Sequence, residues 1–149
     1  MMWNHLSVDR IVPEEDVQRA WAEVFALPVE AVAVTPDWGE DDRWARPEVR
    51  VAVARFEEPD HEFPMILSVV LRDDPLEAAV VGDARTLDAI QRFCMALDCR
   101  AITAVSADDK TSWPLITPTE RWRIRGFEPA QAGEHLANAT FVPLTVVAA

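Results

Sequence analysis

Glycine is scarce in this sequence, and its scarcity excludes the common phosphate-binding loops. The 149 residues include only four glycines. Gly39, Gly82, Gly126 and Gly133 are too far apart to form a glycine-rich phosphate loop or a dinucleotide-binding fingerprint. A serine nucleophile in the pattern G-x-S-x-G is also absent. We therefore expect no nucleotide cofactor and no hydrolase site of this type.

Histidine and cysteine are equally sparse, and their positions predict no metal centre. His5, His61 and His135 each stand alone, because none has a second histidine or a cysteine at the i, i+4 spacing of a helical zinc site. Cys94 and Cys99 lie in and just after a predicted helix. A chain of this kind is not a cysteine-dense secreted domain, and free cysteines are among the most buried residues. We expect two reduced thiols and no cofactor.

Lysine is nearly absent and the charge is strongly negative, which excludes two classes of partner. The chain has 14 basic and 26 acidic residues, for a formal net charge of −12. Binding to nucleic acid phosphates or to anionic membranes requires clustered basic residues, so we expect neither partner. Most of the excess acid lies in residues 1–75, which hold 17 acidic and 7 basic residues. Such a surface steers the protein towards basic partners.

Long apolar runs are also missing. No stretch is long enough to span a bilayer. The first 16 residues have neither the basic flank nor the apolar run of a secretory signal. These observations predict a cytoplasmic protein with no membrane partner.

Two segments carry the periodicity of amphipathic helices. The first covers residues 13–27, and its apolar side chains follow the i, i+3, i+4, i+7, i+8 spacing of one helix face: Val17, Ala20, Trp21, Val24 and Phe25. Three acidic residues in its first turn complement the helix dipole. The second covers residues 84–98, with Asp83 as its expected N-cap. We predict that Trp21 and Cys94 point into the core.

Alternating or continuous apolar residues predict the strands, which are expected at residues 30–36, 47–56, 65–71, 100–106, 121–127 and 140–147. Trp122 is expected in the core, and Pro143 confines the last strand to a sheet edge or a bulge. A short third helix is expected over residues 128–139. The order α-β-β-β-α-β-β-(α)-β predicts one α+β domain over residues 1–149. Its sheet is largely antiparallel, and the two main helices pack on one face.

One predicted loop combines aromatic and acidic side chains. Within the stretch TPDWGEDDRWARPE, Trp38 and Trp44 flank Glu40, Asp41 and Asp42. Tryptophan is enriched among the residues that dominate binding energies, and exposed carboxylates speed the encounter with basic partners. We predict that these five residues contact a partner protein.

A second predicted loop, over residues 107–114, repeats the combination at Asp108, Asp109 and Trp113. These three residues are the second part of the predicted partner-binding site. Aspartate pairs at 41–42, 73–74 and 108–109 are interpreted as solvated turn residues, because the spacing of a calcium-binding loop is absent. We therefore expect no bound metal ion.

The function predicted from these observations is binding of a basic protein partner. The concrete hypothesis is an immunity-protein-like inhibitor of a toxin in a bacterial cytoplasm, without enzymatic activity. One alternative is a secretion-chaperone-like homodimer that binds an effector, because the order of elements resembles that of type III secretion chaperones. A second alternative is a small-ligand-binding protein or enzyme with a cleft over the sheet.

Overall fold

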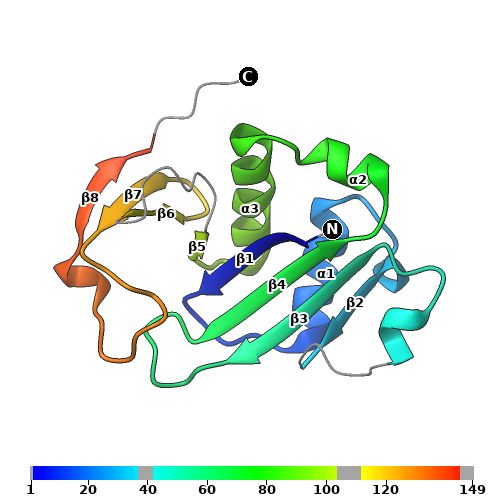
Figure 1. Ribbon diagram of the computed structural model, residues 1–149, viewed down its shortest axis with the longest axis horizontal. Coiled ribbons are helices and arrows are strands. Elements are labelled where there is room, and N and C mark those ends of the chain that lie inside the picture. The colour runs from blue at the N-terminus through cyan, green and yellow to red at the C-terminus, as the bar shows by residue number, and fades with distance from the viewer. Residues whose placement is uncertain (1, 37–41, 104–111, 145–149) are drawn as a thin grey trace.

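The computed structural model describes residues 2–36, 42–103 and 112–144. Within these residues the chain forms one eight-stranded sheet and three α-helices (Figure 1). The elements follow in the order β1 (Met2–Val8), α1 (Glu14–Val24), β2 (Val32–Thr35), β3 (Val51–Glu57), β4 (Met65–Leu71), α2 (Asp74–Ala79), α3 (Asp83–Leu97), β5 (Ala101–Thr103), β6 (Ser112–Ile116), β7 (Arg121–Arg125) and β8 (Thr140–Pro143). Single 3-10 turns form η1 (Val29–Ala31), η2 (Asp42–Ala45) and η3 (Leu136–Asn138).

The strand order of the sheet is β2-β3-β4-β1-β5-β6-β7-β8. Only β2 and β3 run parallel, and every other neighbouring pair is antiparallel. The prediction of an α+β fold with a largely antiparallel sheet is confirmed. Strand β8, which contains Pro143, lies at one edge as predicted, and β2 forms the other edge.

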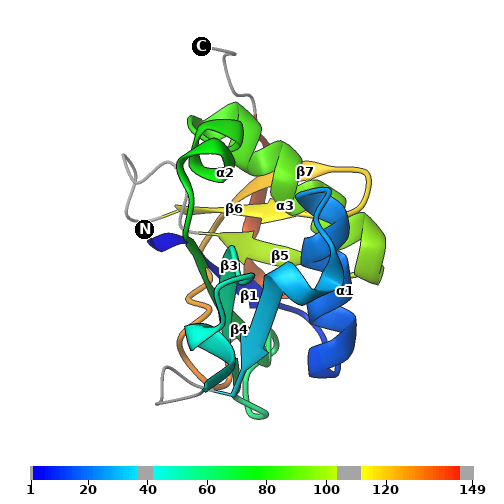
Figure 2. The same ribbon diagram turned by 90° about the vertical axis from the view of Figure 1, so that its right-hand side faces the viewer.

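Helices α1 and α3 pack side by side on the same face of the sheet (Figure 2). Trp21 is completely buried between them, and its ring stacks on Phe93 with 4.2 Å between the centroids. Cys94 is also fully buried, and both cysteines are free thiols. The predicted inward faces of the two helices are therefore confirmed.

A smaller apolar cluster covers the opposite face of the sheet at β5, β6 and β7. Ala101 belongs to the main core and its neighbour Ile102 to this second cluster, as expected because successive residues of a strand point to opposite faces. The buried members of the second cluster are Phe63, Ile102, Leu115, Ile124, Phe127 and Leu136. Trp122 packs against this cluster and is only partly buried, so its core position is confirmed in part.

The structure corrects several local predictions. Strands β1 and β6 and helix α2 were not predicted, and Trp113, expected in a loop, lies in β6. The expected third helix over residues 128–139 is reduced to the single turn η3. Asp83 is the first residue of α3, and Gly82 occupies the N-cap position with φ of 88°. No described helix has the length and apolarity needed to cross a membrane.

The interpretation of Asp73 as a solvated turn residue is wrong. Its side chain accepts a hydrogen bond from the backbone N–H of Leu76 at 2.8 Å and thereby caps α2. The same carboxylate forms an ion pair with Arg50 at the start of β3. The hydrogen bond from the Arg50 guanidinium lowers the pKa of Asp73, and the bond from Leu76 acts in the same direction. Asp73 therefore ties α2 to the sheet.

Candidate functional site

The predicted partner-binding residues divide into described and undescribed positions. Trp38, Glu40, Asp41, Asp108 and Asp109 lie outside the described residues. The other three are described: Asp42 and Trp44 in η2, and Trp113 in β6. Trp44 and Trp113 are both partly buried.

The described flanks of the two predicted loops lie far apart. Strand β2 precedes the first loop, and β5 and β6 flank the second. Three strands separate β2 from β5, and four separate it from β6. Strands β2 and β5 also run in opposite directions, so the chain heads towards opposite ends of the sheet at Thr35 and at Thr103. The structure therefore does not bring Trp44 and Trp113 into one site, and each has its own surroundings.

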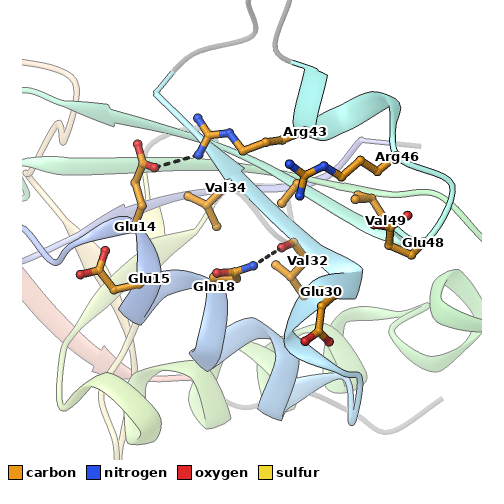
Figure 3. A pocket seen from close by; sticks show the side chains of 11 residues that line it. Glu14, Glu15, Gln18, Glu30, Val32, Val34, Arg43, Arg46, Glu48 and Val49 are labelled. Atoms are coloured by element: carbon orange, nitrogen blue, oxygen red, sulfur yellow. Dashed lines mark hydrogen bonds and ion pairs between the residues drawn. The ribbon is translucent and has the colours of Figure 1, made fainter.

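A groove of about 340 Å³ runs along β2; Arg43 and Arg46 line it, whereas their chain neighbour Trp44 is not among its lining residues. We call it the β2 groove. Strand β2 forms its floor, the first turns of α1 form one wall, and the segment 43–49 that begins in η2 forms the other (Figure 3). The second half of the predicted binding segment 35–48 thus forms part of the groove.

The floor of the β2 groove is a sheet edge. Strand β2 pairs only with β3 among the described strands. The side chain of Gln18, from α1, donates hydrogen bonds to the carbonyl oxygens of Val29 at 2.9 Å and Val32 at 2.8 Å. The Val32 carbonyl therefore points away from β3 and towards the groove. Gln18 thus supplies a hydrogen-bond donor to a backbone carbonyl at an edge where no further described strand pairs with β2.

The charges around the β2 groove are mostly negative. Its charged lining residues are Glu14, Glu15, Glu30, Glu48, Arg43 and Arg46. Glu14 and Arg43 form an ion pair across the groove at 3.1 Å (Figure 3). Within the described ranges, no ion pair involves Glu15, Glu30 or Glu48. These three carboxylates remain available to a cationic ligand.

Sequence reasoning missed all four groove glutamates, since Glu48 was not among the residues predicted to bind a partner. Glu14 and Glu15 were explained by the dipole of α1, and Glu30 precedes the floor strand in the turn η1. The signal that was available was the density of acid in residues 1–75. The glutamates come together only because β2 lies at the sheet edge beside α1. The composition of the sequence does not specify that arrangement.

One histidine has a polar partner that the sequence did not indicate. Nδ1 of His5, in β1, lies 2.7 Å from Oγ of Ser68, in the neighbouring strand β4. A serine nucleophile also needs donors placed for a developing oxyanion. Ser68 instead lies within β4 and pairs on both sides, with His5 and with Ala54. The contact is a cross-strand hydrogen bond with no hydrolytic geometry around it.

Cys94 offers no reactive thiolate. Hydrogen bonding to Cys99 and burial together raise the pKa of Cys94 far above its ordinary value. Nucleophilic attack and metal binding both require the thiolate. Among the residues that the structure describes, no group of three or more His, Cys, Asp or Glu side chains is arranged to hold a metal ion.

Comparisons with known proteins do not assign a function, so a functional proposal has to rest on the geometry of the β2 groove. No family model, no curated protein and no solved structure matches the chain.

Proposed function

We propose that this protein binds and neutralises a basic protein partner, as an immunity protein inhibits a toxin in the bacterial cytoplasm. The observation that carries the proposal is the β2 groove, a sheet edge lined by four glutamates and two arginines. The segment predicted from the sequence to bind a partner supplies one wall of this groove.

Charge and shape act at different stages of binding. The net charge of −12 attracts a basic protein over a distance of about a Debye length, roughly 8–10 Å at physiological salt. Glu15, Glu30 and Glu48 then provide local attraction at the groove itself. Trp38 and Trp44 flank the acidic triplet of the same segment and are proposed as the anchors that slow dissociation.

The test compares two variants with the same change of charge. The partner is captured from the native cell and purified, and its binding is measured by surface kinetics at two salt concentrations. The groove variant is Glu15→Lys with Glu48→Lys. The control is Asp60→Lys with Glu120→Lys, since these exposed residues lie outside the groove.

We expect the groove variant to associate roughly tenfold more slowly than the control and to lose most of its salt dependence, because local charge governs steering. Equal rates for the two variants would show that only the net charge matters, and the groove would then not be the binding site.

The exposed edge strand β8 favours a second candidate, the secretion-chaperone-like dimer. Phe141 and Val142 are 41% and 48% exposed on this strand. An apolar sheet edge without charges is suited to pairing with another chain. Sedimentation of the wild type and of Phe141→Lys separates the two candidates. A dimer that this substitution dissociates supports the chaperone-like function, and a wild-type monomer excludes it.

A further inference from the structure

We propose that the partner enters the β2 groove as an extended segment that adds a strand to the outer edge of β2, with basic side chains on its α1 side. This inference rests on the proposed function and adds the conformation and the side-chain pattern of the partner. Its basis is a backbone edge that pairs with no second strand among the described residues and lies on the floor of a groove, between two walls of different charge.

The backbone of Val34 supplies the first observation. Backbone groups of successive strand residues point to alternate edges, so Val34 points the same way as Val32, away from β3 and into the groove. Among the described residues, the outward N–H and C=O of Val34 have no hydrogen-bond partner outside the sheet. Val34 is only 4% exposed. A buried, unpaired peptide group costs free energy, which an added strand would recover.

The walls of the groove supply the second observation. Helix α1 and the turn that follows β2 lie on opposite sides of this strand (Figure 2). The α1 side presents two acidic residues, Glu14 and Glu15, whereas the other side presents Arg43 and Arg46 together with Glu48. Side chains of an added strand alternate between these two sides. The complementary segment therefore carries lysine or arginine at every second position, with acidic or neutral residues between them.

The ion pair between Glu14 and Arg43 sets a condition on this arrangement. It crosses the groove above Val34 (Figure 3), so an incoming strand must separate the two side chains. A basic side chain of the partner then replaces Arg43 as the cation beside Glu14. Competition between two cations for one carboxylate predicts that removing Arg43 strengthens binding.

The experiment uses synthetic peptides and the full chain. One peptide alternates lysine with threonine, and a second has the same composition with its lysines in one block. We expect the alternating peptide to bind at least about tenfold more tightly, because only its lysines all reach the α1 side. We also expect amide hydrogen exchange at Val34 to slow by about tenfold or more in that complex, since exchange requires the new bond to open.

Methylation of peptide backbone nitrogens tests the strand pairing directly. Amides of an added strand point alternately towards β2 and away from it. Methylating one alternate set should abolish binding, and methylating the other set should change it less than about threefold. Equal effects of both sets, equal binding of the two peptides, or unchanged exchange at Val34 would each overturn strand addition. If the groove variant still weakens binding of the purified partner, the proposed function stands without it.

Variants of the protein test the condition set by the ion pair. Arg43→Gln should tighten binding of the alternating peptide by roughly threefold or more. Arg85→Gln is the matched control, because this exposed arginine lies outside the groove and bears the same charge change. Equal affinities of the two variants would show that the peptide does not displace Arg43, and would overturn the position of the strand beside Glu14.

Discussion

Replacing Trp21 with alanine should destabilise the protein more than any other single truncation in α1. The side chain is completely buried in the main core. Its ring contacts three others, with centroid distances of 4.2 Å to Phe93, 5.6 Å to Trp3 and 5.9 Å to Phe25. Truncation of a buried aromatic residue costs about 3–5 kcal/mol, and this number of ring contacts favours the upper half of that range.

The indole nitrogen gives this prediction an internal control. Nε1 of Trp21 is buried and has no hydrogen-bond partner among the described residues. An unsatisfied buried donor costs about 1–3 kcal/mol, and Trp21→Phe removes it while keeping an aromatic ring. That relief offsets much of the lost packing. We therefore expect Trp21→Phe to lie within about 1.5 kcal/mol of the wild type.

Urea unfolding followed by far-ultraviolet circular dichroism measures both variants, since it is independent of the other tryptophans. The expected free energies of unfolding fall in the order wild type, Trp21→Phe, Trp21→Ala, with the largest gap between the two variants. A loss below about 0.5 kcal/mol in Trp21→Ala is typical of surface sites and would refute the burial of this face. Equal losses in both variants would refute the argument about the unpaired N–H.

Three further predictions concern a cap, the thiols and the binding segment. Asp73→Ala should cost about 1 kcal/mol at neutral pH through loss of the α2 cap. Arg50 lowers the pKa of Asp73. The stability that ionised Asp73 contributes is therefore present above the ordinary aspartate pKa and is lost as the pH falls through the lowered pKa. Denaturation of the wild type and of Asp73→Ala at low pH should show the difference between their free energies of unfolding shrinking. Cys94 and Cys99 should resist thiol reagents in the folded protein, and both should react after unfolding without reductant; a reaction with neither would mean that they form a disulfide. Trp38→Ala should speed dissociation of the purified partner in surface kinetics with little change in association, and an unchanged dissociation rate would remove it from the interface.

The elements with strong periodicity could be predicted from the sequence alone. The apolar stripe containing Trp21 specifies both the existence of α1 and its buried face. The edge position of β8 follows from the missing N–H of Pro143. In both cases one local rule is sufficient, because no distant residue has to be known.

The missed strands depend on distant partners. Asn4 is buried in β1, where a polar residue interrupts the apolar pattern, and it accepts a hydrogen bond from Oγ1 of Thr103 at 2.6 Å. In β6, Pro114 argues against an interior strand. Pro114 pairs with Arg123 of β7, and the described pairing of β6 with β5 covers Leu115 and Ile116, so strands on both sides hold this segment in the sheet. Neither compensation is visible without the tertiary structure.

The candidate site was predicted only in part for a related reason. The segment 35–48 was identified by its own composition, but its described residues that line the β2 groove are Arg43, Arg46 and Glu48, which were not predicted to bind a partner. The opposite wall comes from residues whose charges have a sufficient local explanation in the α1 dipole. The two walls of this groove meet only because of the order of the strands in the sheet. That order could not be read from the sequence pattern.

The two edges of the sheet differ in how they discriminate between a foreign chain and a second copy of this one. At β2, a second copy would bring its own glutamates against Glu15, Glu30 and Glu48, so like charges oppose self-pairing while a basic chain is attracted. Strand β8 has no charged residue from Thr140 to Pro143. In the proposed function the glutamates beside β2 select the partner, and the same charges oppose self-pairing of this edge, so substitutions that remove them should promote aggregation through β2.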